Sequence, residues 1–311
     1  MQWFFRKSAE MDRPVGSTGF SRMDTVVTVA TIAALVCVAS FIGSLVWPVY
    51  RRVQWEANMT QCGDNLRAIG QAMRAYANDY DGALPVAGGR GTRWTGHLHD
   101  WSALARSQAF ALDPDGSNGE ATVSSSLYLL VRYMHLDPKS FVCPVDRRTR
   151  AFRPEKFGIG NKRLGDLWDF GPDPAKHCSY AYQMVYSPYR MTIAAEPGFA
   201  IAADRNPWMD GPAGKAGEFS NFMPDLPGFR GTAEQARLGN ASAHQRDGQN
   251  VLFLDMHANF EKRSYCGVED DNIYTSWDGE DKVRSKPPKL GSQPAGAKDS
   301  LLVNDPPLPR R

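Results

Sequence analysis

A run of 23 residues without a charge, from Thr25 to Trp47, constrains this chain more than any other feature. As a helix rising about 1.5 Å per residue, the run is about 34 Å long and can cross a hydrocarbon core of roughly 30 Å. It therefore predicts a single transmembrane helix. A cleaved secretory signal is the alternative, but its apolar region is about 7–15 residues and ends at small residues, whereas this run ends in WPVYRR.

Basic residues flank the span unevenly, with Arg6, Lys7, Arg13 and Arg22 before it and Arg51 and Arg52 after it. Lysine and arginine concentrate on the cytoplasmic side of a membrane span, so the count favours a cytoplasmic amino terminus.

The whole chain of 311 residues carries 36 basic and 34 acidic side chains, a formal net charge of +2. This balance argues against nucleic acid as a partner, because nucleic-acid binders carry a clustered basic excess.

After the span, apolar residues recur every three or four positions and form one stripe of a helix: Met59, Cys62, Leu66, Ile69, Met73, Tyr76 and Tyr80. Span and stripe predict one long helix over residues 20–82, with Pro48 as the point that favours a bend. The sequence DYDGALP then supplies the glycine and proline that end it. The stripe needs a protein surface to cover it.

A shorter helix is predicted at residues 125–136, and strands are predicted in CSYAYQMVYS, FAIAADRN and NVLFLDMHANFEK. Helices first and an antiparallel sheet afterwards predict an α+β domain over residues 83–278. Residues 279–311 are rich in proline and poor in aromatic residues, which predicts a disordered tail.

The stretch GFSRMDTVV, before and into the span, resembles a class III prepilin signal. In that signal a glycine precedes a phenylalanine, and an acidic residue stands at the fifth mature position. Gly19, Phe20 and Asp24 occupy these places, with aspartate instead of the usual glutamate.

Further blocks resemble the pilin-like bacterial proteins named for their H-X9-DG carboxy-terminal domain: CGDNLRAIGQAMRAYANDYDGALP, SFVCPVDRR, CSYAYQM, AADRNP and HQRDGQNVLFLDMHANFEK. The H-X9-DG-like block covers residues 244–257, but ten residues rather than nine separate His244 from Asp255, and Met256 replaces the glycine. With the prepilin signal, the blocks span residues 19–275.

The resemblance implies a pilin-like fold and a non-enzymatic subunit of a type II secretion or type IV pilus-like filament, with a role in protein transport. A prepilin peptidase would remove the leader 1–19 after Gly19 and methylate Phe20. The implied location is the bacterial inner membrane, with a single span and the bulk of the chain in the periplasm or filament. The implied partners are other copies or related pilins, the peptidase, the assembly platform and membrane lipid.

The spacing between Phe20 and Asp24 allows two interpretations of Asp24, of which the first is a role in assembly. It lies four residues from Phe20, on the same helical face, and can pair with the amine that cleavage creates. The alternative is a carboxylate that only marks the interfacial end of a membrane helix.

Four cysteines lie outside the span and are candidates for disulfide bonds: Cys62, Cys143, Cys178 and Cys266. They can pair in three ways, which the sequence leaves open. A zinc site is less favoured, because no CxxC pair is present.

The best metal-ligand candidates are His244, Asp247, Asp255 and His257, with a polar β-hairpin as the alternative interpretation. The segment DPDGSNGE (113–120) offers oxygen ligands for calcium, or simply forms a turn. We expect no resident cofactor apart from such an ion.

Catalytic motifs such as GxSxG, HExxH and Walker A are missing from the sequence, so we expect no enzyme. Trp94, Trp101, His97 and His99 are candidates for a sugar-binding platform. The alternative function is therefore a membrane-anchored extracytoplasmic module that binds a polysaccharide or protein and does not polymerise. An anchored hydrolase is a third and weaker hypothesis.

Overall fold

The computed structural model describes residues 22–189, 191–210 and 216–308, and the chain divides into two compact units, residues 1–54 and 55–311. Helix α1 (Arg22–Asp79) begins in the first unit and ends in the second. The coarse prediction of a long apolar amino-terminal helix and a globular α+β unit with an antiparallel sheet is confirmed.

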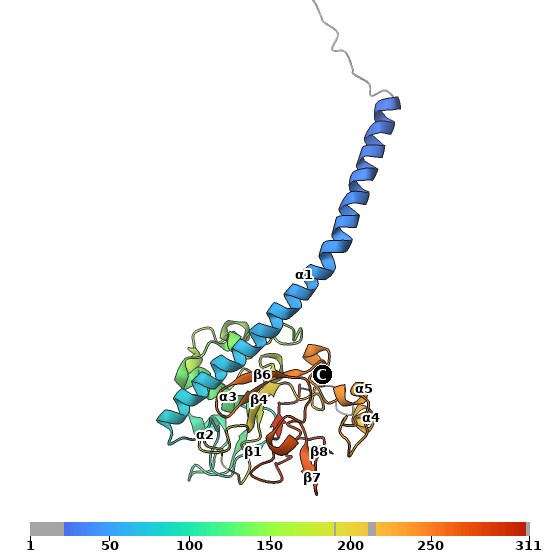
Figure 1. The fold of residues 1–311 in the computed structure, drawn as a ribbon. Helices are drawn as coiled ribbons and strands as arrows, with labels where there is room; N and C mark the ends of the chain where they lie inside the picture. The colour runs from blue at the N-terminus through green and yellow to red at the C-terminus, as the bar shows by residue number, and fades with distance from the viewer. Residues whose placement is uncertain (1–21, 190, 211–215, 309–311) are drawn as a thin grey trace, which may run out of the picture. The chain divides into compact units, whose positions relative to one another are not determined.

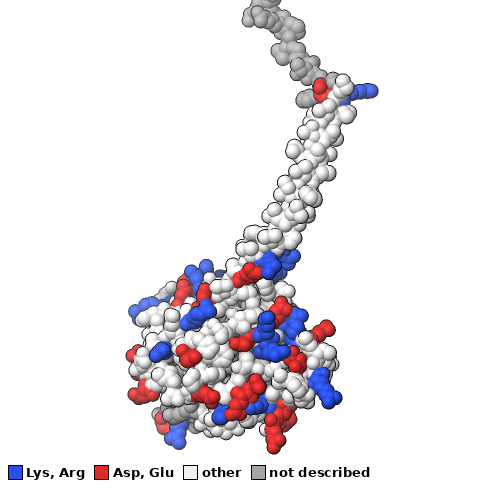
Figure 2. All heavy atoms as spheres, viewed as in Figure 1, with Lys and Arg blue, Asp and Glu red and all other residues white. Residues whose placement is uncertain are grey.

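In the first unit, α1 is long and apolar enough to cross a membrane. Figure 2 shows white, uncharged side chains along this part of the helix, and Asp24 lies in its first turn. The hydroxyls of Thr28 and Thr31 donate to the carbonyls of Asp24 and Val27, four residues earlier, at 2.7 and 2.8 Å. These bonds satisfy two of the hydroxyl groups of the apolar stretch within the helix itself, as an apolar environment requires.

In the second unit, a five-stranded antiparallel sheet has the strand order β6-β5-β4-β3-β9. Its strands are β3 (Tyr180–Gln183), β4 (Ala200–Asp204), β5 (Gln249–Phe253), β6 (Ala258–Glu261) and β9 (Leu302–Val303). β3 and β4 lie within the first two predicted strand segments, which confirms them. The third predicted segment, residues 250–262, is divided by a turn into β5, which begins one residue earlier, and β6.

Short elements surround this sheet. The helices are α2 (Arg106–Ala109), α3 (Val123–Met134), α4 (Ala216–Asn221) and α5 (Ala233–Arg237). The remaining strands are β1 (Arg93–Trp94) paired with β2 (Glu120–Ala121), and β7 (Ser276–Asp278) paired with β8 (Asp281–Lys286). Single 3-10 turns are η1 (Pro138–Phe141), η2 (Pro154–Phe157), η3 (Leu164–Asp166), η4 (Pro174–Lys176), η5 (Ser242–His244) and η6 (Val268–Asp270).

The second half of α1 packs against the sheet through its apolar stripe (Figure 1). The buried members of the stripe are Cys62, Leu66, Ile69, Met73 and Tyr76. They share one core with Ile201 of β4 and Leu252 of β5. Gly70 permits this approach, because a Cβ there would lie 2.8 Å from Leu252 Cδ1. Tyr80, at the end of the predicted stripe, is 40% exposed.

The predicted disordered tail after residue 279 is wrong for most of its length. Residues 281–286 form β8 and residues 302–303 form β9, the edge strand beside β3. Asp305 is buried and accepts hydrogen bonds from the main-chain N–H groups of Val123 and Ser124 and from Trp94 Nε1, at 3.0, 2.8 and 2.8 Å. The segment is therefore fixed by a carboxylate at the amino end of α3, which composition alone does not reveal.

A second buried carboxylate, Asp169, lies in the same region. Burial, followed by the charge of Asp305, raises the pKa of Asp169 to about 8. Its oxygens accept from Ser124 Oγ at 2.9 Å and from Thr122 Oγ1, the side chain that caps α3. Asp169 therefore keeps its proton in the folded chain at pH values where an unfolded aspartate has lost it.

Asp169→Asn should make stability less dependent on pH. Between about pH 4 and pH 8 the folded state holds a proton that the unfolded state has lost, so the free energy of unfolding falls as pH rises. We expect the substitution to reduce this fall by up to about 1.4 kcal/mol per pH unit. Urea unfolding of the full chain in detergent at pH 5, 6.5 and 8 measures it. The exposed Asp100→Asn is the control, and an unchanged slope in Asp169→Asn would contradict the assignment.

Gly70→Val should destabilise the second unit, because its side chain would collide with Leu252 where the helix meets β5. Overpacking of this kind costs about 1–3 kcal/mol. The matched control is Gln71→Val, which introduces the same β-branched residue at the next, exposed helix position. Urea unfolding compares the two, and equal losses would show that helix propensity rather than the close approach sets the effect.

Candidate functional site

The candidate site is a cluster of four buried side chains where α1 meets the sheet. Its members come from α1, the loop after η1, the end of β4, and η5: Cys62, Cys143, Asp204 and His244. One potential ligand atom from each residue lies within 4.8 Å of the others. Three of these residues are fully buried and Cys143 is 1% exposed, so the cluster is shielded from solvent.

Asp204 enters the cluster because it is the last residue of β4, opposite Asn250 of β5. Its Oδ2 accepts hydrogen bonds from the main-chain N–H and the side-chain Nδ2 of Asn250, at 2.6 and 3.2 Å. The same oxygen lies 2.8 Å from His244 Nε2. Asp204 Oδ1 is buried and has no hydrogen-bond partner. The carboxylate is therefore held firmly through one oxygen only.

His244 is oriented by the residues around its ring. Its Nδ1 lies 2.6 Å from Met59 Sδ, while Nε2 faces Asp204 and lies 3.7 Å from Cys143 Sγ. Trp55 and Phe260 pack edge-on against the imidazole, with centroid distances of 6.3 and 6.0 Å. The ring thus presents one nitrogen to the carboxylate and the cysteine sulfur.

Cys62 and Cys143 form a disulfide that joins α1 to the loop after η1, with Cα atoms 5.0 Å apart. Cys178, Cys266 and Cys37 are thiols. The structure therefore selects one bridge from the pairings that the sequence left open. As thiolates, the two cysteines together with an imidazole nitrogen and a carboxylate oxygen are the ligand types that zinc takes in proteins.

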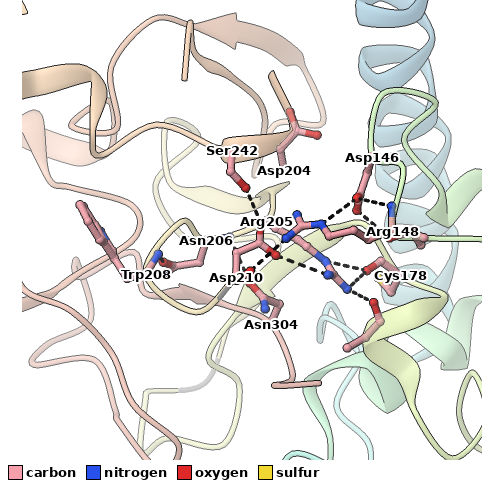
Figure 3. A network of polar contacts seen from close by, with 12 residues as sticks. Asp146, Arg148, Cys178, Asp204, Arg205, Asn206, Trp208, Asp210, Ser242 and Asn304 are labelled. Carbon is pink, nitrogen blue, oxygen red and sulfur yellow. Dashed lines mark hydrogen bonds and ion pairs between the residues drawn. The ribbon is translucent and has the colours of Figure 1, made fainter. Parts of the chain in front are cut away.

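A network of ion pairs and hydrogen bonds borders the cluster and connects the loops around it (Figure 3). Arg205, which follows Asp204, donates through Nε and Nη2 to the carbonyl of Cys178 at 3.0 and 2.7 Å, and its Nη1 lies 3.4 Å from Asp210 Oδ1. Asp210 also pairs with Arg148 and accepts from Ser242 Oγ, which lies two residues before His244. The loop that carries His244 is thereby tied to the end of β4.

Asp146 completes this network on the side of the disulfide loop. Its Oδ1 lies 3.3 Å from Arg148 Nε. Burial opposes ionisation of Asp146, but Arg205, Thr149 and Arg148 outweigh it and lower the pKa of Asp146 below its ordinary value. Asp146 is therefore the charged partner of two arginines.

The structure does not bring the four predicted metal-ligand candidates together. Asp247 is exposed and pairs with Arg237. Asp255 and His257 pair with each other, both 44% exposed, in the turn between β5 and β6. Instead, His244 lies beside Asp204, Cys62 and Cys143. Asp204 was not predicted as a site residue, although a carboxylate at the end of a buried strand was the available signal.

The other predicted site residues are also separate from the cluster. Gly19 and Phe20 lie outside the described residues. In the calcium candidate 113–120, side chains bond to one another, as in Ser117 Oγ to Asp115 Oδ1 at 2.6 Å, which matches the turn interpretation. Trp94 is buried against Asp305 and Trp101 packs on Phe152, so the two rings do not form an exposed platform.

A separate open cleft of about 1330 Å³ lies beside the end of α1. Its lining includes Tyr76, Tyr80, Arg90, Arg93 and Arg106. The rings of Tyr76 and Tyr80 stack with centroids 4.1 Å apart. Burial, followed by the neighbouring tyrosines, raises the pKa of Tyr76 to about 12, so its hydroxyl stays neutral. Aromatic and cationic groups thus line one open cleft.

Removing the bridge with Cys62→Ala/Cys143→Ala should lower the free energy of unfolding by about 3–4 kcal/mol, because the bridge closes a long loop in the unfolded chain. Urea unfolding of the full chain in detergent measures this loss. Cys266→Ala, which removes a half-buried thiol, is the control. Alkylation of the denatured, unreduced chain should label three of its five cysteines, and five labelled cysteines would contradict the bridge.

Comparison of the chain with protein-family models, with curated proteins and with solved structures gives no match. The resemblance to pilin-like proteins therefore rests on the sequence blocks from Gly19 onward.

Proposed function

We propose that the chain is a structural subunit of the pilin or pseudopilin class, in a type II secretion or type IV pilus-like filament. The observation that carries this proposal is that the two parts of α1 differ in charge and burial. The helix has an acidic residue, Asp24, in its first turn and then bears no charge from Thr25 to Tyr50. Its last part is buried in an α+β unit. One helix thus provides a membrane span and a packing element.

In this proposal the first unit lies in the bacterial inner membrane and the second lies outside it. The filament grows when apolar helices leave the lipid and bundle with other copies. Prepilin peptidase cuts after Gly19 and leaves a cationic amine on Phe20, four residues before Asp24. A buried charge without a partner is costly, so pairing of the amine with Asp24 of the same or a neighbouring chain sets the axial register.

Attachment of α1 within the second unit suits a mechanical role. Five residues of the stripe are in the core, and Cys62 is bonded covalently to Cys143. Force applied along this part of α1 therefore reaches the sheet through packing and the loop after η1 through a covalent bond. This arrangement supports a subunit that pushes or holds cargo.

A second candidate function is an anchored extracytoplasmic binding module that does not polymerise. The cleft of about 1330 Å³ favours it, because tyrosines and arginines line a volume that fits a small saccharide or peptide. The state of the amino terminus separates the two functions. A filament subunit is expected to be cleaved and N-methylated at Phe20, whereas an anchored module is expected to keep its leader.

Asp24→Ala should leave membrane insertion intact and reduce filament assembly at least about 10-fold, because the amine of Phe20 would enter the helix bundle without its partner. Carbonate extraction measures insertion. Cross-linking of the sheared surface fraction measures assembly.

Asp24→Glu is the matched control and should assemble normally, since it keeps the charge. Mass spectrometry of the mature amino terminus shows whether both variants are processed. Normal assembly of processed Asp24→Ala would refute the role of Asp24, and an intact leader on the native chain would refute the filament proposal itself.

A further inference from the structure

We propose that the dithiol form of this chain binds a zinc-class divalent cation through the buried cluster of Cys62, Cys143, Asp204 and His244. Formation of the Cys62–Cys143 disulfide releases the ion, because a sulfur in a disulfide is no longer a thiolate ligand. The site is independent of the filament role proposed above. It would connect α1 to the sheet in the state in which the disulfide is absent.

The four ligand atoms lie close enough together to reach the spacing of a tetrahedral ion with small movements. Zinc binds sulfur at about 2.3 Å and nitrogen or oxygen at about 2.0–2.2 Å, so ligand atoms around it are separated by roughly 3.3–3.8 Å. The four atoms here already lie within 4.8 Å of one another. His244 Nε2 lies 3.7 Å from Cys143 Sγ and 2.8 Å from Asp204 Oδ2. Breaking the disulfide lets the two sulfurs separate to the required distance.

The buried carboxylate supplies a second, independent observation. Asp204 is fully buried, and its Oδ1 has no hydrogen-bond partner. A buried polar atom without a partner is costly, and a cation beside the carboxylate removes that cost. Asn250 holds the other oxygen through two donors, as the outer partners of metal ligands usually do.

The orientation of His244 also suits a ligand. Its Nε2 faces the carboxylate and the sulfur, while Nδ1 is turned toward Met59 Sδ. Trp55 and Phe260 restrict rotation of the ring. The imidazole therefore already points Nε2 into the cluster, and a small separation from Asp204 Oδ2 makes room for an ion.

The exchange between the two forms balances as thiol–disulfide chemistry. A dithiol reductant gives two electrons and two protons to Cys62 and Cys143 and becomes a disulfide itself. The ion then displaces both thiol protons and binds the thiolates. In the reverse direction a disulfide oxidant takes two electrons, its two sulfurs take up two protons, and the divalent cation is released.

Cobalt(II) binding to the full chain in detergent tests the site, because thiolate-to-cobalt charge transfer gives a near-ultraviolet absorption band and tetrahedral cobalt gives visible bands. We expect the chain reduced with a phosphine to bind one cobalt ion, which zinc displaces, and the oxidised chain to bind none. Cys62→Ser/Cys143→Ser should abolish the charge-transfer band. His244→Gln should weaken binding more than about 100-fold, and Asn250→Ala about 10-fold.

Cys178→Ser/Cys266→Ser is the matched control, since it removes two thiols that lie outside the cluster, and it should bind cobalt normally. Near-ultraviolet circular dichroism establishes that each variant is folded, with the oxidised form of His244→Gln as a reference. The proposal is overturned if the reduced chain gives no band or loses its fold without recovery on adding cobalt. It is also overturned if the band survives loss of Cys62 and Cys143 or disappears in the control.

Discussion

The second unit depends on the packing of the second half of α1 against the antiparallel sheet. An amphipathic helix and a sheet with an apolar face are each unstable in water until one covers the other. Gly70 brings the helix backbone close to Leu252, and the residues of the stripe fill the space on either side. The disulfide joins α1 to the loop after η1, so a covalent bond adds to the burial that holds the helix in the second unit.

Buried carboxylates fix the loops and chain ends that lie outside this helix–sheet contact. Asp305 binds the amino end of α3 and thereby fixes the segment after β9, while Asp169 caps the same region as a neutral acid. Asp210 joins Arg148 and Arg205 across three loops. Because each of these groups is costly to bury without its partner, they select one arrangement of the loops.

The same physical features support the proposed function. A filament subunit has to keep its helix attached to its globular part while that helix changes from lipid to protein surroundings. The buried stripe and the Cys62–Cys143 bond provide the attachment, and the uncharged first part of α1 permits the change of surroundings. The metal proposal extends this idea, since an ion would make the same connection before the disulfide forms.

The sequence by itself determined α1, α3 and the three segments that form β3, β4 and the β5–β6 pair, because their hydrophobic periods are carried by consecutive residues. It also identified Cys62, Cys143 and His244 as chemically important, but not as neighbours. Their meeting with Asp204 was decided by the tertiary structure, which joins positions up to 182 residues apart. The ordered carboxy-terminal segment was also decided by the tertiary structure. Strand β9 has two residues, too few to show an alternation of apolar and polar side chains, and its pairing with β3 and the hydrogen bonds of Asp305 fix it.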